Sequence, residues 1–463
     1  MTESRELLER IIKNHYCIGC GSCASIDGSP FRMKMDEYGN IVSEPYKDPD
    51  SSDVRVLKLC PFSEQAKNED ELSEIFFHDI KNNHPKIGKY LACYAGFVEE
   101  GAFREKGSSG GFGKWLGYTL LKENIIDYFI QVYPNQTKDP SKPLFDYSIV
   151  SDKESVVSGS KSSYYPVSLA KILKTVRDRE GRYAITGVPC FIKALRLLSL
   201  EDEIIRTRIK YSFGIICGGM KSANQSKIIG WQLGINPDNL VAIDFRRKHK
   251  DKPAGYKIYQ VWSNIDDRER FKDAGEIYAT DWGSGYFKPN ACDYCDDVVG
   301  ETSDISFGDS WLPRFESDPR GTSLIIVRNT GLLNLLERYL ENKSITLYDL
   351  APEDVVKAQE GGFRQRRDAL SYRIAKKEKK GEWYPPKRVK ANEIKITRKR
   401  KKIYSLREKI ARQSHLSALK ALNSGDLSIF YREMEPLRKK YHSALYGSLP
   451  VRAFRKIKRI LLK

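Results

Sequence analysis

The stretch Cys17-Ile18-Gly19-Cys20-Gly21-Ser22-Cys23, with a distant Cys60-Pro61, decides how this chain begins. A Cys-x2-Cys-x2-Cys run wraps a loop around a cubic iron–sulfur cluster, and a remote Cys followed by Pro supplies the fourth thiolate. Gly19 and Gly21 provide the backbone freedom that so tight a loop needs. We therefore predict a 4Fe–4S cluster on Cys17, Cys20, Cys23 and Cys60, in a small α+β ferredoxin-like domain over residues 1–80.

Zinc is the alternative metal that these four thiolates could bind. Tetrahedral zinc sites usually take two ligands from each Cys-x2-Cys pair, so a third cysteine at the same spacing favours the cluster. Disulfides are disfavoured, because nine cysteines in 463 residues is a low density and residues 1–13 lack the apolar core of a signal peptide. No run approaches the ~18 apolar residues of a membrane span. We expect a cytoplasmic protein.

The net charge of +18 is unevenly distributed along the chain. Residues 361–463 carry 31 Lys and Arg against 8 Asp and Glu, whereas the first 360 residues carry 48 against 53. Such a basic C-terminal extension predicts an anionic partner. Its last segment, residues 451–463, mixes apolar and basic side chains and predicts an amphipathic helix in peripheral contact with the inner face of a membrane. A solvated, partly disordered tail is the alternative.

The chain between residues 88 and 350 alternates short apolar runs with helical stretches. This alternation predicts an α/β body, with a mixed sheet and flanking helices, followed by the basic helical extension over residues 361–463. The expected strands span residues 182–186, 211–217, 304–309 and 322–328. The expected helices span residues 112–122, 168–179, 191–200, 223–233 and 332–341.

Four more cysteines fall in this body, namely Cys190, Cys217, Cys292 and Cys295. The first two follow predicted strands, and the other two form a Cys-x2-Cys pair in a loop. Ligands of open α/β sheets gather beyond the carboxyl ends of strands, so we expect these loops to converge. They would hold a second 4Fe–4S cluster, with zinc or unliganded buried thiols as the alternatives. Cys93 is left over and is expected to be structural.

The loop Gly107-Ser108-Ser109-Gly110-Gly111 precedes the helix predicted over residues 112–122. Its small residues admit a close approach, its hydroxyls can bond oxygens, and a helix N-terminus favours an anion. The loop therefore suits a phosphate-bearing cofactor, with an ordinary helix start as the alternative. Clusters pass single electrons, and a flavin is the usual group that converts them into pairs.

Several motifs follow one another in a familiar order. They are residues 106–112, Ser158-Gly159-Ser160-Lys161, Thr186-Gly187-Val188-Pro189-Cys190, Asp244-Phe245-Arg246, the Cys292/Cys295 pair, Gly308-Asp309-Ser310-Trp311 and Gly321-Thr322-Ser323-Leu324. Over about residues 10–345 the chain resembles the coenzyme F420 hydrogenase/dehydrogenase beta-subunit family, with its frequent N-terminal ferredoxin-like domain. The basic extension lies outside the resemblance.

The resemblance implies an iron–sulfur flavoprotein oxidoreductase with FAD as cofactor. Its electron partners would be a ferredoxin or another low-potential donor, a deazaflavin or a small organic substrate. The implied flavin contacts are Ser108, Ser109, Gly110, Gly111, Ser160, Lys161, Thr186, Gly187 and Pro189. Lys161, His249 and Asp309 are the candidate catalytic residues, as proton donors or anion-binding groups.

Three functions remain in view. The first function is a reductase that passes electrons from ferredoxin through the clusters to FAD and on to an organic substrate. The substrate could be a sugar precursor of a surface glycan, since family members in bacteria without the deazaflavin are associated with polysaccharide synthesis. The second is an electron-transfer beta subunit that oxidises or reduces coenzyme F420 within a larger complex. The third is a basic-tailed binding protein with structural metal sites, although no signature of specific nucleic-acid recognition is present. The sequence leaves a homo-oligomer open.

Overall fold

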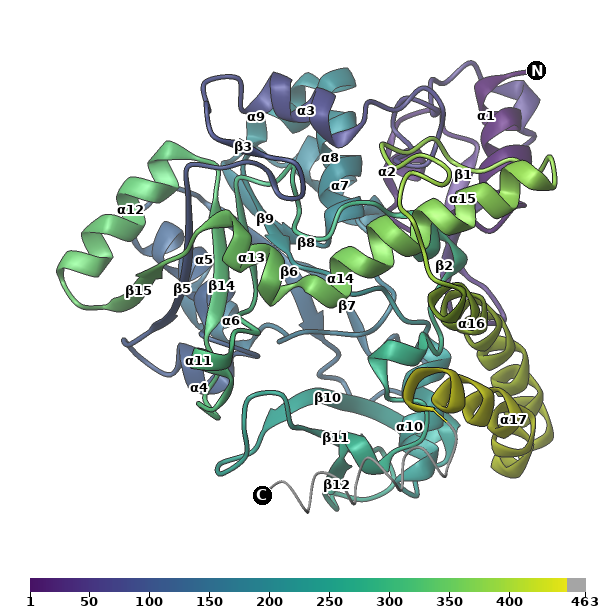
Figure 1. The fold of residues 1–463 in the computed structure, drawn as a ribbon. Helices are drawn as coiled ribbons and strands as arrows, with labels where there is room; N and C mark the ends of the chain where they lie inside the picture. The colour runs from purple at the N-terminus through teal and green to yellow at the C-terminus, as the bar shows by residue number, and fades with distance from the viewer. Residues whose placement is uncertain (448–463) are drawn as a thin grey trace.

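A computed structural model describes residues 1–447, which are built around an eight-stranded sheet (Figure 1). Its spatial order is β15-β5-β14-β13-β9-β8-β6-β7. The neighbours β13, β9, β8 and β6 are parallel, and the strands on either side of them are antiparallel. The strand bounds are β5 Ala92–Val98, β6 Tyr128–Pro134, β7 Phe145–Val150, β8 Tyr183–Gly187, β9 Ile209–Ile215, β13 Ile305–Asp309, β14 Ser323–Val327 and β15 Ile345–Asp349. The predicted α/β body is confirmed.

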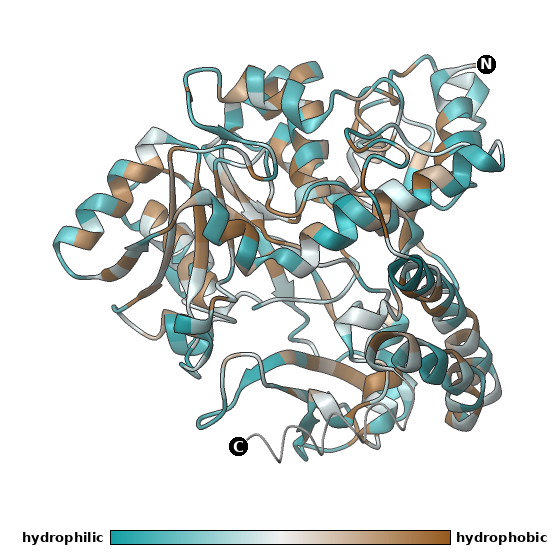
Figure 2. Ribbon diagram, in the orientation of Figure 1, coloured by the Kyte–Doolittle hydropathy of each residue, from teal (hydrophilic) through white to brown (hydrophobic). Residues whose placement is uncertain are grey.

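Helices cover both faces of this sheet, because its strands are apolar on both sides. Every residue of β14 is buried. The helices α5 (Phe112–Lys122), α6 (Lys153–Ser158) and α12 (Thr330–Glu341) pack in one core around Trp115 and Phe213. The helices α7 (Ala170–Asp178), α8 (Pro189–Glu201) and α9 (Glu203–Arg208) belong to a second core. Figure 2 shows the strands as largely apolar ribbons between helices whose outer faces are polar.

A smaller antiparallel sheet lies below the carboxyl ends of the parallel strands (Figure 1). It consists of β10 (Leu240–Lys248), β11 (Lys257–Ser263) and β12 (Arg270–Asp273). The helix α10 (Ala223–Gln232) packs against β10. Short helices α4 (Phe103–Lys106), α11 (Pro313–Glu316), α13 (Pro352–Ala358) and α14 (Glu360–Phe363) complete the body.

The N-terminal region is formed by short elements around the first cysteines. They are α1 (Glu3–Glu6), a π-helical turn (Leu7–Ile12), α2 (Ser22–Ser25), the hairpin of β1 (Phe31–Met35) and β2 (Ile41–Pro45), and α3 (Glu69–Phe76). A capping box of Asn68 and Glu71 starts α3. A second small hairpin is formed by β3 (Asn83–His84) and β4 (Gly88–Lys89).

The C-terminal extension is folded onto the rest of the protein. Its helix α15 (Ala369–Lys379) runs towards the N-terminal region, and α16 (Arg398–Ser424) and α17 (Leu427–Tyr446) form an antiparallel hairpin (Figure 1). The hydroxyl of Ser414 accepts the backbone N–H of Phe287 at 2.8 Å in a buried contact. The alternative of a solvated tail is therefore wrong for residues 361–446. The membrane helix predicted over residues 451–463 lies outside the described residues.

Most predicted helices and strands agree with the structure to within a few residues at each end. The main difference concerns Cys190, which we placed in a turn and which lies in the first turn of α8. The physical reason is Pro189, whose fixed φ and missing N–H suit the first position of a helix. Across residues 1–447, no helix is long and apolar enough to cross a membrane.

Candidate functional site

The first cysteine set lies around one apolar cavity. Cys17, Cys20, Cys23 and Cys60 all line it, together with apolar side chains such as Leu59. The backbone N–H of Ser43 donates to Cys17 Sγ at 3.3 Å. The loop passes so close to β2 that a Cβ at Gly19, whose φ is +78°, would meet the carbonyl oxygen of Ile41 at 2.4 Å.

Burial raises the pKa of each thiol in this set, and the neighbouring thiols add to the effect in Cys20, Cys23 and Cys60. The pKa of Cys20 rises to about 11. Mutual influence of this kind shows that the four sulfurs lie close together. Within the described residues, however, no group of three or more Cys, His, Asp or Glu side chains is placed so that it could hold a metal ion.

The second cysteine set converges at the carboxyl ends of β8 and β9. Burial raises the pKa of Cys190 well above its usual value, and Cys295, Cys292 and Cys217 raise it further. Burial likewise raises the pKa of Cys292 to about 12, although a nearby guanidinium, that of Arg366, opposes the rise. Four thiols and one buried cation therefore share this place.

Arg366 comes from the C-terminal extension and is 3% exposed. Its guanidinium donates to the backbone carbonyl of Cys217 at 2.8 Å and to that of Cys292 at 3.4 Å. Sequence reasoning did not connect this residue with the cysteines, because they lie 70 or more positions away along the chain. The contact fixes the two loops relative to each other.

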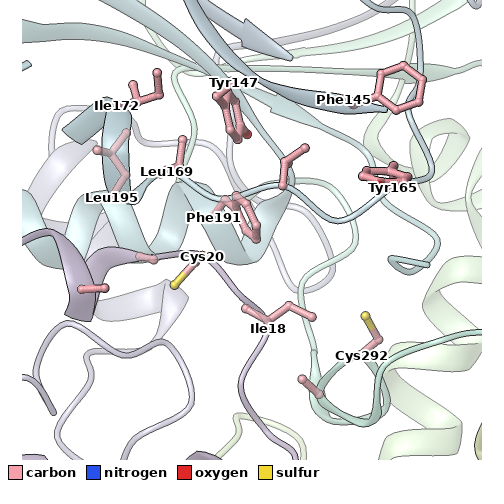
Figure 3. Close-up of a cluster of buried hydrophobic side chains, with 14 of the residues drawn as sticks. Ile18, Cys20, Phe145, Tyr147, Tyr165, Leu169, Ile172, Phe191, Leu195 and Cys292 are labelled. Carbon is pink, nitrogen blue, oxygen red and sulfur yellow. The ribbon is translucent and has the colours of Figure 1, made fainter. Parts of the chain in front are cut away.

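The two cysteine sets adjoin. Cys20 is among the groups that raise the pKa of Cys190, and its carbonyl accepts the N–H of Leu169 at 3.0 Å. Cys20 and Cys292 border the same cluster of apolar side chains, as Figure 3 shows. The N-terminal set is thus built against the body.

A cavity of about 990 Å³ opens on the other side of the second set, and Cys217 lines it. The four parallel strands all contribute to its wall at their carboxyl ends, where ligands of such sheets bind. The residues that these four strands contribute are Gln131 and Val132 of β6, Thr186 and Gly187 of β8, Ile215 of β9, and Phe307, Gly308 and Asp309 of β13. The cavity thus lies at the carboxyl ends of the strands, where we expected the cysteine-bearing loops to converge.

Seven of the nine residues implied as flavin contacts line this cavity, namely Ser108, Ser109, Gly111, Ser160, Lys161, Thr186 and Gly187. Pro189 does not, because it begins α8. Gly110 does not either, since it packs against β5, where a Cβ would meet the carbonyl oxygen of Gly96 at 2.4 Å.

Two features of the lining are open to a ligand. The hydroxyl of Ser160 is buried and has no hydrogen-bond partner among residues 1–447. No side chain caps the N-terminus of α5, although Gly111, Phe112 and Gly113 line the cavity there. The free N–H groups of a first helical turn favour an anionic oxygen.

The charged residues of the cavity wall are paired in an ordered way. Lys161 Nζ lies 2.6 Å from Asp244 Oδ2, and Arg246 holds both carboxylate oxygens of Asp309 at 2.7 Å. Burial alone would raise the pKa of Asp309, but Arg246 lowers it below the usual value. Asp309 therefore stays an ionised structural partner of Arg246 rather than a proton donor near neutral pH.

The third candidate catalytic residue lies elsewhere. His249 follows the end of β10, and its Nε2 lies 2.8 Å from Asp273 Oδ1 on β12. It is not part of the cavity wall. Sequence reasoning instead missed Lys257, which does line the cavity. Burial, helped by Arg246, lowers the pKa of Lys257 to about 7.

The cavity is strongly basic. Nine Lys and Arg side chains line it against the two carboxylates of Asp281 and Asp309. The basic residues are Lys114, Lys161, Lys221, Arg246, Lys257, Lys288, Arg364, Arg407 and Arg438. The last three come from the C-terminal extension, and no local sequence pattern predicts that the extension lines the cavity. A cavity of this charge suits an anionic ligand.

Comparisons with known proteins agree with this architecture. Residues 93–174 match the model of the coenzyme F420 hydrogenase/dehydrogenase beta subunit N-terminal part, and residues 180–353 match that of its C-terminal part. The chain is 23% identical over 374 residues to the uncharacterized protein MJ1349 of Methanocaldococcus jannaschii, covering 75% of this chain and 93% of that protein.

Among solved structures, a chain of the F420-reducing NiFe hydrogenase complex from Methanosarcina barkeri matches with a TM-score of 0.48 and 15% identity. The match covers 64% of this chain and 96% of that one. The two family matches together span more than half of the 463 residues. The chain therefore belongs to the coenzyme F420 hydrogenase/dehydrogenase beta-subunit family, which is of oxidoreductase and electron-transfer type.

Proposed function

We propose that the chain is an electron-transfer subunit that relays electrons through two 4Fe–4S clusters to FAD in the basic cavity. There it would oxidise or reduce coenzyme F420 as part of a larger complex. The family supplies the general activity, and the arrangement of the cysteines and the cavity supports the rest.

The observation that carries the proposal is that the first cysteine set, the second cysteine set and the cavity lie next to one another in that order. The Cys17–Cys23 loop adjoins Cys190 through Cys20, and the second set adjoins the cavity through Cys217. Thiolates are the ligands that iron–sulfur clusters require. Because four irons spread their four thiolates around a cube, a cluster also needs wider sulfur spacing than a single zinc ion. The absence of a tight single-ion site within residues 1–447 is compatible with that geometry.

The volume and the hydrogen-bond donors of the cavity support the proposal of FAD. Its volume of about 990 Å³ is large for a small-molecule site, and the unpartnered Ser160 hydroxyl and the uncapped start of α5 are available to flavin or phosphate oxygens. When bound, a flavin would exchange single electrons with clusters and electron pairs with an organic partner. The Lys161–Asp244 and Arg246–Asp309 pairs would hold the surrounding loops and keep positive charge beside it.

A second candidate keeps the clusters and FAD but replaces F420 with a small organic substrate, such as a glycan precursor, and takes electrons from ferredoxin. One observation favours it. The two family matches stop at residue 353, whereas Arg364, Arg407 and Arg438 of the extension line the cavity. The extension therefore gives the cavity a wall beyond the part of the chain that matches the family.

The test is anaerobic purification with quantification of iron, zinc and flavin, followed by mixing with reduced F420 and, separately, with reduced ferredoxin. We expect about eight irons per chain for two four-iron clusters, one FAD, and rapid flavin reduction by F420. Reduction by ferredoxin alone would favour the second candidate. Zinc in place of iron, or a protein without flavin, would refute both.

A further inference from the structure

We propose that the end of the cavity between residues 281–285 and helix α16 binds an anionic group, a phosphate or a carboxylate, of a ligand. Lys221 of the body and Arg407 of the extension would bind it together. The inference rests on the proposed function only in that the same cavity would hold the redox cofactor.

Lys221 is a buried ammonium group without an ionic partner. Its side chain is 3% exposed and lines the cavity. Its Nζ donates to the backbone carbonyl of Tyr286 and lies 4.7 Å from the ring centre of Trp282. Among the described residues no carboxylate forms an ion pair with it. A buried charge of this kind is costly unless an opposite charge compensates it.

The pKa of Lys221 is consistent with the lack of an ion-paired carboxylate. Burial, followed by the repulsion of Lys288, lowers it to about 7. Lys288 itself is engaged with Asp293 at 2.5 Å. The nearby carboxylate of Asp281 caps its own loop, since it accepts the N–H of Gly283 at 2.8 Å and the hydroxyl of Ser284 at 2.6 Å.

Arg407 faces the same loop from α16. A Cβ at Gly283 would meet its Nη2 at 3.7 Å. Its guanidinium donates to two neutral groups, the Gln365 side-chain oxygen at 3.2 Å and the Tyr441 hydroxyl at 3.3 Å. Its Nε is buried without a partner, and within residues 1–447 it forms no ion pair.

The loop of residues 281–285, which lines the same cavity as both cations, is held firmly. Tyr441 of α17 donates to the carbonyl oxygen of Gly283 at 2.8 Å, and Ser414 of α16 accepts the N–H of Phe287 at 2.8 Å. Trp282 packs edge-on to Tyr164 with ring centres 4.6 Å apart. Lys221 lies ahead of α10 and Arg407 on α16, and neither forms an ion pair among the described residues, although Asp281 and Cys292 partly offset the burial of Lys221. Two such cations beside a fixed loop form a preorganised anion site.

Two sources could supply the anion: a phosphate of the bound cofactor, or a charged group of a second ligand. Both have the chemistry that these donors recognise. The experiment separates them by measuring flavin content and anion binding in the same preparations.

The experiment uses the full chain purified anaerobically, with inorganic pyrophosphate as the probe in isothermal titration calorimetry. The variants are Arg407→Gln, Lys221→Gln and Arg407→Lys. Arg412→Gln is the matched control, because Arg412 is exposed on the same helix and lies outside the cavity wall. Since Lys221 is buried, thermal unfolding is recorded for every variant, and Arg407→Gln carries the test should Lys221→Gln not fold.

If a second ligand supplies the anion, Arg407→Gln keeps its flavin and binds pyrophosphate about tenfold or more weakly, as the loss of a charged hydrogen bond predicts. Arg407→Lys then recovers part of the affinity. If the cofactor supplies it, the loaded wild-type protein does not bind pyrophosphate, and Arg407→Gln loses flavin. The proposal is overturned if Arg407→Gln matches Arg412→Gln in both pyrophosphate affinity and flavin content. Iron and flavin in the wild type test the proposed function separately.

Discussion

Arg388, in the segment that joins α15 to α16, is the residue whose replacement tests how the extension is held. Its side chain is 10% exposed and forms ion pairs with four carboxylates. The pair with Glu301 is bidentate, at 2.7 and 2.8 Å. Asp296 lies at 3.4 Å, Asp70 at 2.8 Å and Glu69 at 3.5 Å. One guanidinium therefore joins the extension to α3 and to the second cysteine loop.

Arg388→Met keeps most of the stem and removes the charge. Glu69, Asp296 and Glu301 are each at most 4% exposed, so the variant removes a shared cation from three buried carboxylates. Glu69 keeps its pair with Lys193, and Glu301 keeps its pair with Arg367. Breaking a buried ion pair from one side costs about 3–5 kcal/mol. Unfolding entropy of about 2.1 cal/mol/K per residue, over 463 residues, amounts to about 1 kcal/mol/K. For unfolding as one unit, Tm should fall by about 3–5 °C.

The assay is thermal unfolding followed by circular dichroism, with Arg182→Met as the control. Arg182 also forms a two-point contact with its carboxylate, Asp127, at 2.8 and 3.1 Å, but its side chain is 45% exposed. Exposed pairs contribute little, so the control should barely move Tm. The double variant Arg388→Met/Glu301→Gln should recover part of the loss, because it removes one unpaired charge. Equal Tm values for Arg388→Met and Arg182→Met would refute the argument.

Three further outcomes can be measured on the same preparations. Cys20→Ala should lose about four of the eight irons expected from two clusters, whereas Cys93→Ser, on a body strand, should lose none; equal iron contents would contradict the assignment. Lys161→Gln should lower flavin content, because it removes a cation from the cavity wall, while Lys122→Gln at the far end of α5 should not. Sulfate keeps its charge between pH 6 and 8, so its binding in the cavity should weaken by up to about tenfold over that range as Lys257, with a pKa of about 7, loses its proton. Sulfate binding that is independent of pH would exclude Lys257 as a contributor.

Lys257 also has a predictable effect on how folding stability changes with pH. Its folded pKa lies below the unfolded value of 10.5, so the unfolded chain binds more protons between about pH 7 and 10.5. Stability contributed by this group therefore rises with pH through that interval. The carboxylates around Arg388 give a dependence of the same sign, at lower pH. Burial would raise the pKa of Glu69, yet Lys193 and Arg388 lower it overall, so its contribution is lost as the pH falls through the folded pKa.

The fold and the cysteine positions were predictable because they depend on local patterns. Buried parallel strands appear as short apolar runs, and the spacing of Cys17, Cys20 and Cys23 is visible within seven residues. The carboxyl-end rule for parallel strands then places Cys190 and Cys217 near the same edge of the sheet, where the structure has them.

Partners chosen across long stretches of chain could not be predicted in this way. Lys161 pairs with Asp244, 83 residues later, and Asp309 with Arg246, 63 residues earlier. No periodicity records which of many charged residues will meet. His249, a candidate catalytic residue from the family resemblance, likewise has a distant partner, because its Nε2 lies 2.8 Å from Asp273 Oδ1 and the residue does not line the cavity.

The basic charge of the extension shows that an uneven distribution of charge along a chain can serve either an outside partner or ion pairs within the protein. The 31 basic and 8 acidic residues of the extension suggested an external anionic partner. Several of the basic residues instead form contacts within the protein. Arg373 is 1% exposed and lies 2.9 Å from Asp293. At the second cysteine loop, Arg366 is buried and the Arg388 side chain is 10% exposed. The body is mildly acidic in the same sequence, so the two parts are complementary partners of one chain. Among residues 361–447, other basic side chains stay exposed, including Lys399, Lys401 and Lys402 at the start of α16.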